Sequence, residues 1–346
     1  MNLSVLYALA AAALFGASTP LAKLLGLNVP PVLLAGLLYL GSGLGLTVVR
    51  FVRDHGWKPT GLTPSEWPWL IGAIAFGGVL APVALMFGLT RTSGATASLI
   101  LNLEAVLTAI LAWVVFKENA DRRIVWGMIA IITGGMVLAW PLETMQPHDW
   151  LGPLAVSLAC LCWAIDNNLT RKVSASDALF MAGFKGLIAG LVNCSLAMLV
   201  GSRINEFSVL APTLGLGFLG YGVSLVLFIM ALRGLGSART GAYFSTAPFL
   251  GAAIAIVAMG EPVSLSFWIA AVLMGIGVWL HLTESHSHEH RHIPLTHGHR
   301  HVHDEHHQHE HSFEWSGNGA HSHVHDHAQI RHSHPHFPDI HHRHTH

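Results

Sequence analysis

Two ionisable side chains, Glu104 and Lys185, stand inside long apolar runs of this sequence. An ionised group at mid-bilayer costs at least ~2.5–3.5 kcal/mol on insertion scales, so each one needs a partner or a task. At ~1.5 Å per helical residue, Glu104 lies about 15 Å and Lys185 about 13 Å from the end of its run. Both depths are near the middle of a bilayer core about 30 Å thick. We therefore predict that the two charges face one cavity and pair with each other.

Such a pair could bind a polar or zwitterionic solute, or Glu104 could exchange protons and so use a proton gradient. The alternative is structural, with each charge neutralised by the other or by free backbone carbonyls. Asp166 and Tyr221 are further candidates for binding a solute in the cavity. Asp166 lies about five residues from the end of its run, however, and could equally reach the water boundary or cap its helix.

A second group of candidate ligands lies in the C-terminal segment, which holds all but three of the chain's 26 histidines. Neutral imidazole is the commonest protein ligand for zinc, nickel, copper and cobalt ions. Because the spacing is irregular, we expect several weak, exchangeable sites. The candidate metal ligands are His286, His288, His290, His297, His299, His301, His303, His321, His323, His325 and His327.

The same segment allows two other interpretations. It could be a polycation that charges as the pH falls through the histidine range near ~6.5, or an inert solubilising tail. Its few apolar residues cannot bury a core, so we predict that residues 283–346 are disordered. From residue 286 to residue 346, four arginines stand against seven acidic residues, a balance that excludes nucleic-acid binding.

The elements that must position Glu104 and Lys185 are membrane-spanning helices. Of the 346 residues, 52% are hydrophobic and only 11% are charged, whereas soluble domains carry roughly 25% charged residues. A spanning helix needs ~20 apolar residues. The sequence predicts an all-α membrane protein with ten such helices, at residues 3–25, 29–51, 68–90, 95–117, 123–140, 150–170, 177–200, 211–232, 237–259 and 264–282.

The ten runs divide into two repeats. Residues 87–118 align without a gap on residues 230–261 at a shift of 143 positions, and each copy closes with a glutamate, Glu118 or Glu261. Another apolar run, with a Trp and paired small residues, follows each glutamate. We predict a first five-helix repeat over residues 1–140, a second over 150–282 and the histidine-rich tail over 283–346.

The basic residues predict how the helices are oriented. Lys and Arg gather in the loops on the cytoplasmic side of a membrane. The loops after the odd-numbered runs hold Lys23, Arg91 and Arg203, and those after the even-numbered runs hold Arg50, Arg53, Lys58, Lys117, Arg122, Arg123, Arg171, Lys172, Arg233 and Arg239. Both termini are therefore predicted to be cytoplasmic. A repeat of five helices must also be inverted in its second copy.

A known family combines these features. The ten-helix plan, the aromatic and small residues that open each repeat (from Phe15 and from Trp163), and the two endings in Glu, Trp and paired Gly resemble the EamA branch of the drug/metabolite transporter superfamily. The resemblance covers residues 3–282. It implies a small secondary carrier of the inner (plasma) membrane, with a central cavity between its two halves.

The sequence supports three hypotheses of function. The first is a permease that exports a small polar metabolite or toxic compound by alternating access. Its partners are the lipid bilayer and the solute, with protons as the candidate coupling ion, and it requires no cofactor. The second is a nickel, cobalt or zinc exporter, or a metal-regulated permease, that uses the tail. The third is a metal-binding or sensing protein anchored by a former carrier. No nucleophile–base arrangement or nucleotide fingerprint predicts an enzyme, and the oligomeric state stays open.

Overall fold

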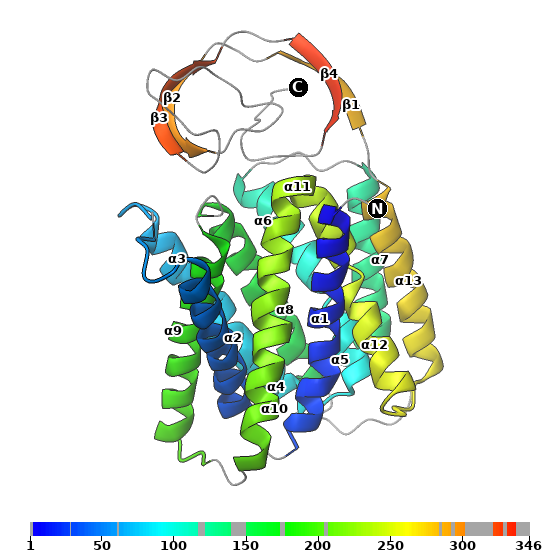
Figure 1. The fold of residues 1–346 in the computed structure, drawn as a ribbon. Coiled ribbons are helices and arrows are strands. Elements are labelled where there is room, and N and C mark those ends of the chain that lie inside the picture. The colour runs from blue at the N-terminus through cyan, green and yellow to red at the C-terminus, as the bar shows by residue number, and fades with distance from the viewer. Residues whose placement is uncertain are drawn as a thin grey trace.

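The computed structural model describes residues 3–27, 29–60, 62–116, 122–139, 150–173, 177–203, 207–283, 286–291, 295–301, 321–327 and 331–336. Most of them form one bundle of helices (Figure 1). In chain order the helices are α1 (Leu3–Leu25), α2 (Pro31–Arg53), α3 (Trp67–Ala73), η1 (Ile74–Leu80), α4 (Ala81–Leu89), α5 (Gly94–Ile100), α6 (Leu103–Phe116), α7 (Arg122–Ala139), α8 (Leu151–Arg171), α9 (Ala178–Leu199), η2 (Phe207–Val209), α10 (Leu210–Leu216), η3 (Gly217–Val223), α11 (Ser224–Phe244), α12 (Ala247–Val257) and α13 (Leu265–Leu282).

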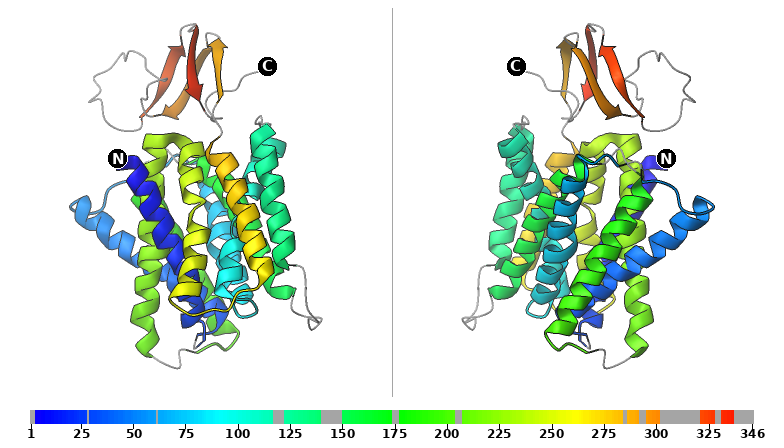
Figure 2. Two further views of the ribbon diagram at one scale, coloured as in Figure 1. Left: turned by 90° about the vertical axis from the view of Figure 1, so that its right-hand side faces the viewer. Right: turned by 90° about the vertical axis from the view of Figure 1, so that its left-hand side faces the viewer.

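The repeat seen in the sequence recurs in the backbone. Residues 74–80 form a π-helical stretch, η1, and adding 143 to each number gives the only other described stretch of this kind, η3 at 217–223. The same shift takes α3 onto α10 and α7 onto α13. In all views the N-terminus and the C-terminal end of α13 lie at the same end of the bundle (Figures 1 and 2).

The predicted count of ten spanning helices is not confirmed. Among the described residues, six helical stretches are long and apolar enough to cross a membrane: 3–25, 31–53, 67–89, 94–111, 178–199 and 210–231. Shorter apolar helices lie at 125–138, 247–257 and 265–280. The run at 150–170 is helical as α8, but Asp166, Asn167 and Asn168 interrupt its apolar character.

The loop expected between residues 232 and 237 is not a break, because α11 continues through it to Phe244. In the first repeat, Ser93 starts α5 by accepting a hydrogen bond from the Thr96 N–H at 2.9 Å. A serine that caps the N-terminus of a helix in this way favours the start of a new helix. The second repeat has Gly236 at the equivalent position, which offers no side-chain acceptor. Its helix breaks at Ser245 and Thr246, close to the positions equivalent to the break at Leu101 and Asn102 in the first repeat.

The prediction of disorder over residues 283–346 is also not confirmed where the structure describes this segment. It contains strands β1 (His286–Arg291), β2 (Leu295–His301), β3 (His321–His327) and β4 (Arg331–His336). β1 pairs antiparallel with β4, and β2 with β3. The physical reason lies in the His-x-His spacing, since a period of two residues is that of an extended strand. His303 lies outside the described residues.

Helices α2 and α9 approach each other through glycines. A Cβ added to Gly186 of α9 would lie 2.5 Å from the backbone nitrogen of Gly43 and 3.0 Å from the carbonyl oxygen of Tyr39, both on α2. Gly36 and Gly190 make similar backbone contacts further along. Small residues permit this close approach between helices in a membrane. It brings α9, and with it Lys185, against α2.

Gly186→Ala should therefore destabilise the protein, because its Cβ meets backbone atoms that cannot rotate away. Overpacking of this kind costs roughly 1–3 kcal/mol. The measurement is the thermal unfolding midpoint in detergent. The matched control is Gly215→Ala on α10, where an added Cβ meets nothing within 4 Å and helix propensity favours alanine. Equal midpoints for the two variants would contradict the close packing of α2 and α9.

Charged residues tie the end of α2 to the start of α9. Asp177 caps α9 by accepting a hydrogen bond from the Leu179 N–H at 3.1 Å, and it also accepts hydrogen bonds from Arg50 at 3.2 Å and Arg53 at 3.1 Å. Partial burial alone would raise the pKa of Asp177, but the hydrogen bonds from Arg53 and Arg50 outweigh it and hold this pKa below its ordinary value. This network holds α2 and α9 together at the end of the bundle where the N-terminus lies (Figure 1).

The stability that Asp177 contributes should depend on pH. Since its pKa is lowered by folding, its contribution is present above the ordinary Asp value of about 3.9 and is lost as the pH falls through the lower folded value. We expect Asp177→Asn to lower the unfolding midpoint by a constant amount above pH ~4, and by less as the solution becomes more acidic. Glu66→Gln is the control, because this carboxylate accepts its described hydrogen bonds from Thr63. A difference that grows in acid would refute this role of Asp177.

Candidate functional site

The π-helical stretch η1 presents two carbonyl oxygens to the rest of the bundle. The Gly77 oxygen accepts hydrogen bonds from the Tyr39 hydroxyl at 2.6 Å and from the Trp163 indole N–H at 3.1 Å. The Gly78 oxygen accepts one from the Asn193 side-chain amide at 3.1 Å. π-Helical turns disturb the regular backbone pattern and are frequent at functional sites. Here one such turn gathers α2, α8 and α9 around itself.

A buried ion pair lies directly against this turn. Lys185 of α9 donates to the Asp166 carboxylate of α8, and both residues are buried. The Thr170 hydroxyl donates to the other carboxylate oxygen at 3.0 Å. A Cβ on Gly77 would overlap Asp166 Oδ2, so only glycine leaves room for the carboxylate. The ion pair and the π-turn therefore fit one another.

This ion pair corrects the prediction that Lys185 pairs with Glu104. The ammonium group pairs instead with Asp166, which neither reaches the water boundary nor caps its helix. The reason is the hairpin of α8 and α9. Asp166 lies about 7 Å from the end of α8 and Lys185 about 10 Å from the start of α9, so the two lie at nearly the same depth. Counting depth along separate runs did not reveal which neighbour each charge faces.

Glu104 has a different environment. It lies in the first turn of α6, just after the helix break at Leu101 and Asn102, and it is half-buried. Its carboxylate accepts a hydrogen bond from the Asn167 side-chain amide at 2.8 Å. Within the described part of the chain, no basic side chain forms an ion pair with it. Glu104 is thus a carboxylate inside the bundle whose described hydrogen-bond partner, Asn167, is neutral. Asn167 directly follows the ion-paired Asp166 on α8.

Tyr221 belongs to the aromatic side of the same region. It lies in η3 and is buried, with its ring 5.4 Å from that of Tyr39 and 6.0 Å from that of Phe15. Phe15 in turn lies 6.0 Å from Trp163. Among the described residues, the Tyr221 hydroxyl has no hydrogen-bond partner. Tyr39 therefore connects the Tyr221 ring, which it contacts with its own ring, to the Gly77 carbonyl, to which its hydroxyl donates.

The structure thus brings the four predicted solute-binding residues into one region, though not in the predicted pairing. Asn167, Trp163 and Gly77 were not among the predicted site residues. A signal for them exists in the sequence, because glycines near the middle of an apolar run, at Gly77 and again at Gly220 after 143 positions, leave room that side chains from other helices can fill. Among the residues whose side chains the structure describes, no three metal-ligating groups lie together.

Comparison with known proteins agrees with this architecture. The model of the EamA-like transporter family matches twice, over residues 2–140 and 150–283. The chain belongs to the EamA-like transporter family. The resemblance noted in the sequence is confirmed, and the chain is an integral membrane transporter and not an enzyme.

Several relatives carry transporter names. An uncharacterized transporter of Methanothermobacter thermautotrophicus is 26% identical, with 77% of this chain and 82% of the relative covered. The uncharacterized inner membrane transporter YedA of Escherichia coli K12 is 22% identical, with 70% and 78% covered. The probable 4-amino-4-deoxy-L-arabinose-phosphoundecaprenol flippase subunit ArnE of Pseudomonas aeruginosa is 38% identical over 112 residues, which are 31% of this chain and 93% of ArnE.

A solved structure shows the same fold. One chain in a crystal structure superposes with a TM-score of 0.60 at 20% identity, with 80% of this chain and 94% of the other covered. At this level of identity the likeness concerns the fold alone. The EamA-like arrangement of helices thus recurs in a chain of almost unrelated sequence.

The ion pair of this EamA-like protein gives a sharp test. Asp166→Asn should cost about 3–5 kcal/mol in stability, because it leaves the Lys185 ammonium buried without its counter-charge. The double variant Asp166→Asn/Lys185→Met should regain most of that loss, since it removes both charges together. The measurement is thermal unfolding in detergent. Equal losses in the single and double variants would show that the ion pair is not the partner on which Lys185 depends.

Proposed function

We propose that this transporter is a secondary carrier that exports a small polar solute, bound at mid-bilayer beside Glu104, by alternating access between its two inverted halves. The observation that carries the proposal is the Glu104 carboxylate, half-buried and bonded to the neutral amide of Asn167. A carboxylate inside a membrane without a fixed counter-charge favours a cation, an amine or a proton. Carrier sites are expected at this depth, between repeats.

The groups around Glu104 have different roles in binding the solute. Asp166 and Lys185 already neutralise each other, so they hold α8 and α9 in place and leave Glu104 as the group with charge to offer. The Tyr221 hydroxyl, buried and without a described partner, supplies a hydrogen bond to the solute. The aromatic rings of Phe15, Tyr39 and Trp163 exclude water around them. Together they fit a small solute with an amino group.

The name of ArnE, a flippase subunit for an amino-sugar lipid, is consistent with an amine-bearing cargo but concerns a different protein. We extend to this chain only the feature that its own residues support, an acid positioned for an amine. Release of the amine can be driven by a proton that takes its place on Glu104. The same carboxylate then carries solute and proton alternately, and export uses proton entry.

The test uses everted membrane vesicles in which respiration acidifies the interior, followed with a pH-sensitive dye. Putrescine and a panel of amino acids serve as probes. We expect at least one amine to dissipate the gradient with the intact protein and not with Glu104→Gln, while Glu104→Asp keeps part of the activity. Asp177→Asn, which removes an acid outside the bundle interior, should retain transport. Amine-dependent proton flux in Glu104→Gln equal to that of the intact protein would end this proposal.

A second candidate function rests on the C-terminal strands. Their register places histidine opposite histidine along both pairs, as His288 opposite His334 and His299 opposite His323. Opposite Cα atoms in such pairs lie about 4.5–5.5 Å apart, and imidazole is the commonest protein ligand for transition-metal ions. We propose that this tail binds zinc, nickel, cobalt or copper ions and makes the carrier metal-regulated or metal-transporting.

Truncation after Thr283 separates the two candidates. If the tail binds metal, the full chain should retain nickel or zinc after gel filtration, measured by elemental analysis, and the truncated chain should not. Cells that express each version then report whether metal resistance follows the tail. Retention of metal by the truncated chain would refute metal binding by the tail, whereas unchanged amine transport after truncation would leave the carrier function intact.

A further inference from the structure

A cavity of about 620 Å³ lies away from Glu104, where α1 ends and α2 begins. It is bordered by the end of α1 and the start of α2, by the end of α4 and by the residues that lead into α5. The residues that line it include Lys23, Leu27, Leu34, Met86 and Arg91. No residue of the Glu104 region contributes to it, so it is a separate site.

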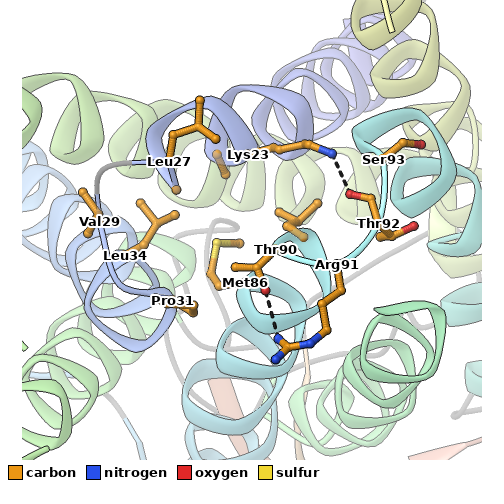
Figure 3. A pocket seen from close by; sticks show the side chains of 13 residues that line it. Lys23, Leu27, Val29, Pro31, Leu34, Met86, Thr90, Arg91, Thr92 and Ser93 are labelled. Carbon is orange, nitrogen blue, oxygen red and sulfur yellow. Dashed lines mark hydrogen bonds between the residues drawn. The ribbon is translucent and has the colours of Figure 1, made fainter. Parts of the chain in front are cut away.

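The cavity is polar on one side and apolar on the other (Figure 3). The side chains of Leu27, Leu34 and Met86 stand on one side, and those of Lys23 and Arg91 on the other. Leu34 and Met86 are buried, whereas Leu27 is 76% exposed and marks the mouth. A ligand that satisfies both sides needs an apolar body and a negatively charged head.

Arg91 is the cation best placed to bind such a head. Its guanidinium lies 3.9 Å from the centre of the Phe87 ring and donates to the Thr90 hydroxyl at 3.1 Å. In the part of the chain that the structure describes, it forms no ion pair. A guanidinium carries five N–H donors in a planar fork that matches carboxylate and phosphate oxygens. Stacking on Phe87 fixes the plane of this fork while most of its donors stay available.

Lys23 is the second cation of the lining, but its charge is already paired. Its ammonium donates to the Thr92 carbonyl oxygen at 2.6 Å and lies 3.5 Å from the Glu261 carboxylate. Glu261, from the second repeat, also caps α5 in the first, accepting hydrogen bonds from the backbone N–H groups of Gly94 at 3.0 Å and Ala95 at 2.9 Å. Arg91 is therefore the cation of the lining that is left for a bound anion.

We infer that this cavity binds the anionic head of an amphiphile, a phosphate or carboxylate held by Arg91, with its apolar part against Leu27, Leu34 and Met86. The ligand is either an anionic lipid of the surrounding leaflet or a free amphiphilic anion from solution. Both sources share the same chemistry, and the experiment below distinguishes them. The site does not depend on transport of an amine at Glu104.

The test measures binding of dodecyl phosphate to the purified full-length protein in phosphatidylcholine nanodiscs, by isothermal titration calorimetry. Dodecylphosphocholine, with the same tail and no net charge, is the ligand control. We expect Arg91→Gln to weaken binding of dodecyl phosphate by about tenfold or more, since hydrogen bonds to charged groups are among the strongest in proteins. Leu27→Asp, an exposed change that places a negative charge at the mouth, should weaken it as well.

Two controls keep the result specific. Lys58→Gln removes an exposed cation at the opposite end of the bundle and should bind dodecyl phosphate like the intact protein. Leu27→Ser should bind more tightly than Leu27→Asp. Nanodiscs with equal parts phosphatidylglycerol and phosphatidylcholine then identify the source: weaker dodecyl phosphate binding indicates an anionic lipid in the cavity, and unchanged binding indicates a free anion. Equal affinity in Arg91→Gln, Leu27→Asp and the intact protein would overturn the inference.

Discussion

A charge buried in an apolar bundle must be compensated where it stands, and the structure around η1 is fitted to that requirement. Removing an ion from water costs several kcal/mol even after relaxation. Asp166 recovers this cost through Lys185 and Thr170, and it can reach them only because Gly77 has no side chain. The same glycine offers its carbonyl to Tyr39 and Trp163. Four helical elements, α2, η1, α8 and α9, are thus held together by the Asp166–Lys185 ion pair and the hydrogen bonds to the Gly77 carbonyl.

The two repeats share a backbone but not a charge distribution. Ser18 of α1 packs against Gly220 of η3 as Asp166 of α8 packs against Gly77 of η1. Near the start of each repeat a shift of 147 positions places Ala35 and Gly36 on Ala182 and Gly183, and the same shift places Leu38 on Lys185. A symmetric scaffold therefore carries polar chemistry on one side and aromatic packing on the other. This asymmetry places the buried Asp166–Lys185 ion pair on the α8–α9 side and not on the α1–α2 side.

Much of this arrangement could be predicted from the sequence, and the failures have physical causes. The apolar runs predicted where most of the described helices lie, and the 143-residue repeat with its closing glutamates indicated the family, because both patterns are visible in the order of the residues. The depth of Lys185 could be counted along its run, but its direction around the helix axis depends on how α8 and α9 pack, and so its partner could not be predicted.

Other features leave weaker traces in the sequence. The π-turns depend on backbone hydrogen bonding, and their only sequence trace is the glycines at 77 and 220. For the tail, low apolar content predicted disorder, whereas alternation of histidines favours extended strands. In the tail, composition predicted disorder and the periodicity of the histidines predicts strands, and the described residues form strands.

The equivalent positions of η1 and η3 in the two repeats bear on how the protein evolved. A π-helical turn holds one residue more than an α-helical turn, so each stretch records a residue added to an ordinary helix. Two independent additions would rarely fall on the same position of two repeats 143 residues apart. The added residue was therefore present in the ancestral five-helix unit before that unit was duplicated and its two copies were fused.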